Sequence, residues 1–127
     1  LDSSLAYVIL PALKKFKEST HGYPSFDHLP EEKWKDEWDN ILDKMIWSFE
    51  QLNTDWEEQY HSGVADFIFV PVDAEGNEVP KGKNTFSEMR HGPNHTFEVD
   101  WEGRKAHQER INNGLRLFGK YYQALWD

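Results

Sequence analysis

A stripe of large apolar residues runs through the middle of the chain's first half at the spacing of an α-helix. Residues three and four positions apart share one helix face. Pro30 suits a first helical position, and Glu31 and Glu32 complement the positive end of the helix dipole. We therefore predict a long amphipathic helix that begins near Pro30, ends before Gly63 and packs against more than one neighbour. The stripe consists of Trp34, Trp38, Ile41, Met45, Phe49, Leu52 and Trp56.

The same periodicity marks a first helix, whose apolar positions are Leu5, Val8, Ile9, Ala12, Leu13 and Phe16. Pro11 lies inside it and lacks a backbone donor, so we expect a kink or a restart there. The helix should end near His21, because Gly22 suits a left-handed C-terminal position and Pro24 discourages continuation.

A last helix should begin near Asp100 or Arg104 and run to Leu125, with His107, Ile111, Leu115, Phe118, Tyr122 and Leu125 on one face. A glycine inside a helix costs about 1 kcal/mol relative to alanine. Gly103, Gly114 and Gly119 are therefore predicted to mark close contacts between helices wherever they fall within this one.

Between the second and last helices the pattern becomes extended. The run from Phe67 to Val70 favours a strand, and residues 73–77 have turn chemistry, which together predict a short hairpin. Pro71 cannot donate to a ladder, so this strand belongs at an edge or stops there. Residues 80–95 are rich in Gly, Pro, Asn and Lys, which indicates an exposed loop, and residues 96–99 add one more short strand.

These elements predict a mainly α fold. We expect a compact bundle of about three long helices in one domain, residues 1–127, with a small β-hairpin and loop insert over about residues 62–99 before the last helix. The width of the second helix's apolar surface further suggests a homodimer or higher oligomer.

Charge narrows the classes of partner. A formal net charge of −9 opposes binding to nucleic acid, and no apolar run approaches the roughly 20 residues of a membrane span. The absence of cysteine excludes disulfides and thiolate chemistry. Residues 31–58 contain ten acidic side chains against three lysines, whereas in residues 80–95 Lys81, Lys83 and Arg90 face only Glu88. We therefore expect one negatively charged surface and one positively charged surface.

Four segments resemble a family of small, uncharacterised bacteriophage proteins. They are Tyr7-Val-Ile-Leu-Pro-Ala-Leu-Lys-Lys-Phe-Lys17 with His21-Gly-Tyr-Pro24, the stretch from Trp38 to Glu50, and the stretch from Arg110 to Trp126. The resemblance covers the first and last helical parts and leaves the insert as an addition. It implies a phage origin and helical packing. If the chain is phage-encoded, we expect it to act in the host cytoplasm. It carries no catalytic residue, because no activity is assigned to the family.

Metal sites have weak support in the sequence. Glu58 and His61 have the Glu-x-x-His spacing of di-iron bundles, but that fold needs a second such pair. His91 and His95 provide two ligands where zinc needs three or four.

An acidic series on the second helix could hold magnesium, as in helical nucleotide pyrophosphohydrolases, but the last helix offers only Glu102 and Glu109 as facing carboxylates. A solvated face, partly neutralised by pairs such as Glu31 with Lys35, is the commoner outcome. We expect no catalytic residue, no metal and no cofactor. The series consists of Glu32, Asp36, Asp39 and Asp43.

The basic insert is the candidate binding site, since its side chains offer anion donors and a stacking surface. A solvated loop is the plainer alternative. We predict a non-enzymatic phage accessory protein that sequesters a nucleotide-type signalling molecule of host defence. An acidic decoy that occupies a host protein's basic groove and a metal-dependent nucleotide hydrolase stay open as alternatives. The site residues are Lys81, Lys83, Phe86, Arg90, His91, Asn94 and His95.

Overall fold

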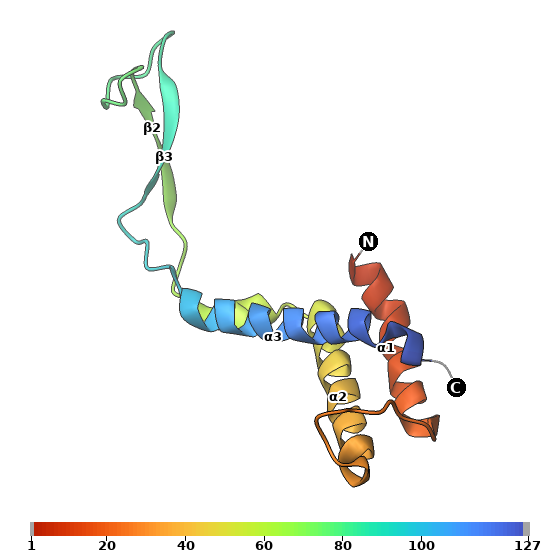
Figure 1. Cartoon of the computed structure of the whole chain (residues 1–127). Coiled ribbons are helices and arrows are strands. Elements are labelled where there is room, and N and C mark those ends of the chain that lie inside the picture. Colours follow the sequence, from red (N-terminus) through yellow and green to blue (C-terminus); the bar gives the residue numbers. More distant parts are fainter. Residues whose placement is uncertain (1, 126–127) are drawn as a thin grey trace. The chain divides into compact units, whose positions relative to one another are not determined.

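The computed structural model describes residues 2–125, with side chains from residue 4 onward. Three helices are packed together, and two small antiparallel sheets are inserted before the last helix, which confirms the predicted mainly α fold (Figure 1). The helices are α1 (Asp2–Ser19), α2 (Trp34–Leu52) and α3 (Trp101–Lys120), with short 3-10 turns η1 (Glu31–Lys33), η2 (Trp56–Tyr60) and η3 (Tyr122–Ala124). The strands are β1 (His61–Ser62), β2 (Phe67–Val72), β3 (Phe86–His91) and β4 (Glu98–Val99).

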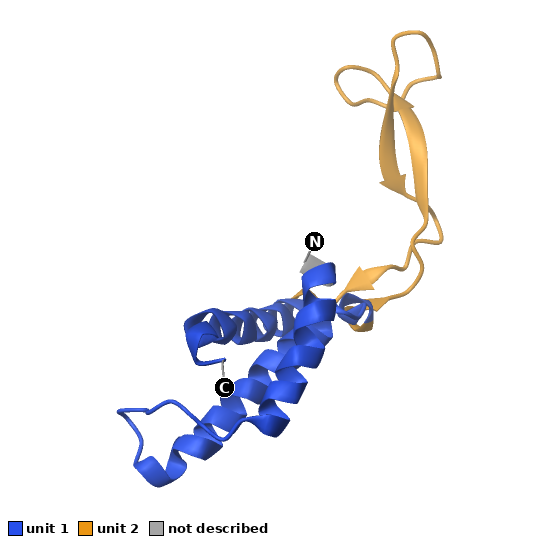
Figure 2. Cartoon of the chain, turned by 90° about the vertical axis from the view of Figure 1, so that its right-hand side faces the viewer, with its two compact units in different colours: residues 1–58, 102–127 blue, residues 59–101 orange. Residues whose placement is uncertain are grey.

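The chain divides into two compact units (Figure 2). The helical unit contains residues 1–58 and 102–127, and the hairpin unit contains residues 59–101. The predicted insert lies inside the hairpin unit. In that unit β1 pairs with β4, and β2 pairs with β3.

In the helical unit, α1 and α2 lie side by side and α3 lies across them (Figures 1 and 2). The predicted stripe of α2 forms the centre of the core, where Trp38, Met45 and Phe49 are buried together with Leu13 of α1 and Leu117 of α3. Each such side chain contributes about 1.5–3 kcal/mol by leaving water. Because the chain itself covers this stripe, the width of α2 gives no ground for a dimer. Within residues 2–125 no helix is long and apolar enough to cross a membrane.

Two details of α1 differ from the prediction. The helix continues through Pro11 to Ser19, so no restart occurs. Gly22 is not left-handed, since the glycines with positive φ among the described residues are Gly63 and Gly76. The last helical hydrogen bond runs from the backbone N–H of Thr20 to the carbonyl of Phe16, and the chain continues without regular structure.

The insert differs more from the prediction. The strand that pairs with β2 is β3, which lies within residues 80–95, where the sequence predicts a loop. Residues 73–77 do form a tight turn, with the Asp73 carboxylate accepting from the backbone N–H groups of Glu75 and Asn77, and Val72 bridges to Glu78. The chain then returns over residues 80–85 and pairs along all six residues of β2. An isolated Val72–Glu78 bridge satisfies little of the strand's backbone, so pairing with β3 is favoured.

Candidate functional site

The seven residues predicted to bind a ligand lie in two places. Lys81 and Lys83 belong to the connection at the Val72 end of the hairpin, where Val72 pairs with Phe86. The residues His91, Asn94 and His95 lie at the opposite end, where Phe67 pairs with His91. Six-residue strands separate those ends by roughly 17 Å at the rise of an antiparallel strand. The seven side chains do not form one site.

Arg90 is neutralised by neighbouring carboxylates. Its guanidinium donates to Glu88 at 2.6 and 2.8 Å and to Glu78 at 3.3 Å. The hydrogen bond and charge of Glu88, followed by the charge of Glu78, raise the pKa of Arg90 above its ordinary value. Lys81 and Lys83 are exposed and form no ion pair within residues 2–125.

The two predicted histidines do come together, on the opposite face of the hairpin from Arg90. His91 and His95 stack with ring centroids 3.8 Å apart, and Phe67 packs against both at 5.7 and 5.0 Å. Alternate residues of a strand face opposite sides, so His91 and Arg90 point away from each other.

A tight chain reversal places His95 over the hairpin. The Asp66 carboxylate accepts from the backbone N–H of Asn94 at 3.0 Å, and the Gly92 N–H donates to the Asp66 carbonyl at 2.7 Å. A Cβ on Gly92 would lie 2.3 Å from the Asp66 carboxylate, so a larger residue there would displace that carboxylate from its place beside Asn94. The Asp66 N–H donates to Nδ1 of His95 at 3.0 Å, so the neutral imidazole carries its proton on Nε2.

These rings border an open hollow of about 430 Å³, which we call the aromatic hollow. That volume falls in the range of ligand-binding pockets. Trp101 is 65% exposed and Phe67 is 44% exposed, so ring surface is accessible. The pairing of β4 with β1 sets the positions of Glu98 and Val99. The lining consists of Phe67, His91, His95, Phe97, Glu98, Val99 and Trp101.

The same face of the hairpin continues as an uncharged apolar surface. Phe69 and Met89 are cross-strand partners on the side of Phe67 and His91, and they are 70% and 59% exposed. Pro71 and Ser87 complete this face, which we call the hairpin face. Sequence reasoning missed Phe69 and Met89 because the face to which a side chain belongs depends on a register that only β3 reveals.

The hairpin unit as a whole is acidic. It contains seven aspartates and glutamates against three lysines and arginines, a formal net charge of −4. The basic bias of residues 80–95 is therefore outweighed within its own unit.

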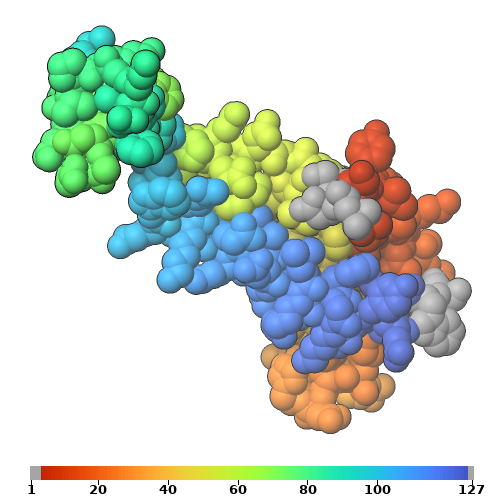
Figure 3. Space-filling model, turned by 90° about the horizontal axis from the view of Figure 1, so that it is seen from above, coloured from red at the N-terminus to blue at the C-terminus, as the bar shows by residue number. Residues whose placement is uncertain are grey.

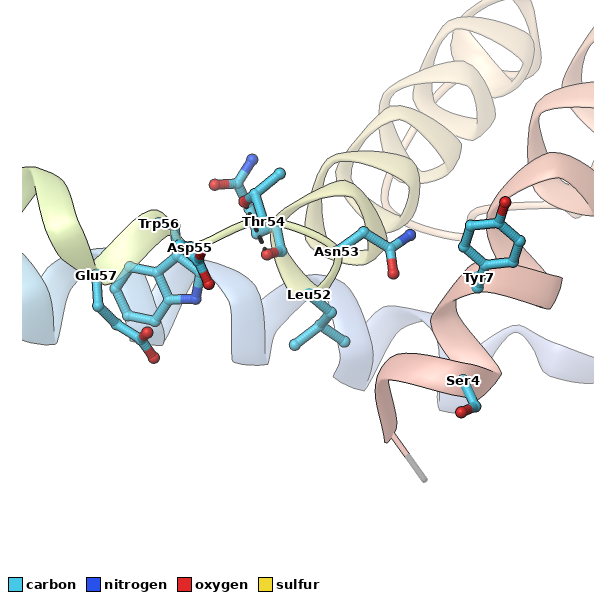
Figure 4. Close-up of a pocket in the computed structure, with 9 residues that line it drawn as sticks. Ser4, Tyr7, Leu52, Asn53, Thr54, Asp55, Trp56 and Glu57 are labelled. Atoms are coloured by element: carbon cyan, nitrogen blue, oxygen red, sulfur yellow. Dashed lines mark hydrogen bonds between the residues drawn. The ribbon is translucent and has the colours of Figure 1, made fainter.

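A second open hollow, of about 730 Å³, lies in the helical unit beside the turn after α2 (Figure 4). Figure 4 shows Asn53 between Tyr7 of α1 and the Thr54–Asp55 turn, with Glu57 at the other end of the row. Its wall contains two carboxylates and no lysine, arginine or histidine. It contains none of the predicted site residues.

His107 joins α3 to α2 and η2 beneath that turn. Its ring stacks on Trp56 at 4.4 Å, packs against Trp47 at 5.1 Å and bonds Gln51 through Nε2 at 2.8 Å. Burial, followed by the charge of Arg110, lowers the pKa of His107. In Figure 3 the blue surface of α3 lies beside the yellow surface around residues 50–58, at the end of α2 and the start of η2.

The metal candidates do not assemble into a site. Glu58 lies in η2 and His61 in β1, so the pair does not share a helix face. On α2, Asp39 pairs with Lys35 and Asp43 pairs with Lys17, which is the partly neutralised surface expected, although Lys35 pairs with Asp39 rather than with Glu31. Among the residues the structure describes, no group of three or more histidines and carboxylates is arranged for a metal ion.

No family model, curated protein or solved structure matches the chain. Its own residues and the surfaces they form are therefore the guide to its function. The aromatic hollow and the adjoining hairpin face are the surfaces on which most exposed ring and methionine side chains of the hairpin unit meet.

Proposed function

We propose that the chain is a non-enzymatic bacteriophage accessory protein that binds a host protein through its hairpin unit. The observation that supports this is the exposed surface formed by the aromatic hollow and the hairpin face. Contiguous apolar patches on soluble proteins mark interaction sites, and aromatic residues and methionine are enriched at the centres of interfaces. The phage origin depends on the sequence resemblance of the helical segments.

Charge favours a protein over a phosphorylated molecule as the occupant. The cation nearest to the hollow along β3, Arg90, is on the other face and bound by Glu88 and Glu78. Lys81 and Lys83 lie at the far end of the hairpin, and Glu98 would repel a phosphate in the hollow.

Capture of a host protein by the purified, tagged chain tests the proposal. A double variant of the hairpin face, Phe69→Ser with Met89→Ser, should abolish capture of a partner that is then identified, purified and shown to bind in a fixed ratio. The matched control is Leu5→Ser with Val8→Ser, which changes two exposed apolar residues of α1, 51% and 71% exposed.

Equal capture by wild type and by the hairpin-face variant would overturn the proposal. If capture instead needs the carboxylates of η1 and of the first turn of α2, tested with Glu32→Gln and Asp36→Asn, the acidic-decoy alternative replaces it. The two surfaces lie in different units, so these variants separate the two ideas.

Sequestration of a nucleotide-type signalling molecule is the second candidate. One observation favours it: the stacked His91 and His95 rings, with Phe67 and Trp101, offer ring surface to a base. A thermal-shift screen against cyclic and ADP-ribose-type nucleotides, with and without magnesium, tests it. Stabilisation without turnover supports sequestration, turnover that requires magnesium supports the hydrolase alternative, and no shift removes both.

A further inference from the structure

The aromatic hollow combines accessible ring faces with one carboxylate. Trp101, Phe67 and Phe97 belong to its wall, and Glu98 lies in the same wall. Glu98 is exposed and forms no ion pair with any residue in the described range 2–125. Ring faces carry partial negative charge, so they attract cations, and a nearby carboxylate adds to that attraction.

No lysine or arginine lies in the wall of the hollow to oppose a cation. The Nδ1 atom of His95 accepts a hydrogen bond from the backbone N–H of Asp66, which holds this ring in place at the wall. Its stacked neighbour His91 adds a further ring to the wall. The charge of the hairpin unit, −4, and that of the whole chain, −9, have the same sign as Glu98.

On these grounds we infer that the aromatic hollow receives an arginine side chain of the partner protein. The guanidinium is planar and weakly hydrated, so it stacks on Trp101 or Phe67 while donating to the Glu98 carboxylate. Arginine is also enriched at the energetic centres of protein interfaces. The inference rests on the proposed function, since it names the group by which the partner is recognised.

The test is a titration of the full chain, at about pH 8, with a glycine–serine peptide that contains one arginine, followed by NMR of the tryptophan indoles and histidine rings. The arginine peptide should shift the signals of Trp101 and His95. The same peptide with citrulline, which has the shape of arginine without its charge, should bind at least about fivefold more weakly.

Two matched variants separate the hollow from general attraction to an acidic protein. Glu98→Gln should weaken binding of the arginine peptide about fivefold, since it removes the carboxylate of the hollow. Glu75→Gln removes the same charge in the exposed 73–77 turn of the hairpin unit and should leave binding unchanged. A third variant, Trp101→Leu, should weaken binding to a similar extent, whereas Tyr122→Leu, in the helical unit, should not.

Equal binding of the arginine and citrulline peptides, or equal effects of Glu98→Gln and Glu75→Gln, would overturn the inference. Failure here and failure of the proposed function give different results. A captured host protein whose binding is insensitive to Glu98→Gln leaves the proposed function in place and removes the arginine. If the chain prefers the arginine peptide to the citrulline peptide but captures no host protein, the hollow's selectivity for arginine stands and the proposed function fails.

Discussion

Gly114 sets how closely α3 approaches α2. A Cβ at this position would lie 1.8 Å from Oγ of Ser48 and 2.5 Å from the carbonyl oxygen of Lys44, and the latter is backbone that cannot rotate away. Ser48 is completely buried, so the helices would have to move apart. The sequence predicts a close contact at Gly114 from the cost of a glycine within a helix, but the same argument applied to Gly119 is wrong, because nothing lies within 4 Å there.

Gly114→Ala should therefore lower the free energy of unfolding by about 1–3 kcal/mol, the usual cost of overpacking a core. Gly119→Ala is the matched control. It should raise the free energy of unfolding by up to about 1 kcal/mol, because alanine favours the helix and the space is open. Guanidinium unfolding of both variants measures the difference, and effects of the same sign would contradict the contact.

At the scale of elements, the stack of His107 between Trp47 and Trp56 ties α3 to α2 and to η2. This contact joins segments more than fifty residues apart, and the sequence indicated only that His107 faces the core. Burial lowers the pKa of its imidazole in the folded chain, so the unfolded chain takes up the proton first. The neutral His107 ring therefore stabilises the fold fully at a pH above the ordinary histidine pKa of about 6.5. This stabilisation is lost as the pH falls below that value.

We accordingly expect the stability difference between wild type and His107→Phe to change with pH. Phenylalanine keeps the stacking area but cannot titrate. The free energy of unfolding of wild type, relative to the variant, should fall between pH 7.5 and pH 5.5. Denaturant unfolding at both values measures this, and a difference independent of pH would mean that the His107 ring takes up its proton equally well in the folded chain.

At the scale of the whole molecule, acidic charge is spread over both units rather than opposed by a basic insert. Of the three cations in residues 80–95, Arg90 is bound within the hairpin unit, and the unit as a whole is negative. The basic surface predicted for residues 80–95 is therefore reduced to Lys81 and Lys83. An acidic chain attracts basic partners at long range, and salt screens that attraction.

The association rate of the host partner should therefore fall as salt is raised from about 50 to 500 mM, while the dissociation rate changes less. Surface plasmon resonance at several salt concentrations measures both rates. An association rate that rises with salt would exclude electrostatic attraction and favour apolar burial on the hairpin face alone.

The sequence by itself determined the three helices, the strand from Phe67, the turn at residues 73–77 and the negative charge. These features depend on local periodicity, turn chemistry and composition. Neighbouring residues determine them, and distant residues do not. The stripe of α2 is the clearest case, because apolar residues at helical spacing leave little other way to bury them. Six of the seven predicted residues lie in α2, whereas the helix ends at Leu52 and the seventh, Trp56, lies in η2.

Only the tertiary structure decided which residues form the candidate site. The alternation in β3 is too polar to predict a strand, and its register with β2 then sends Arg90 to one face and His91 to the other. Glu78 reaches Arg90 from twelve positions away, and Phe97 and Trp101 join the hollow through contacts that spacing does not encode. Pairing between distant segments depends on how the whole chain packs. The pattern of residues along one segment therefore does not predict its partner or its register.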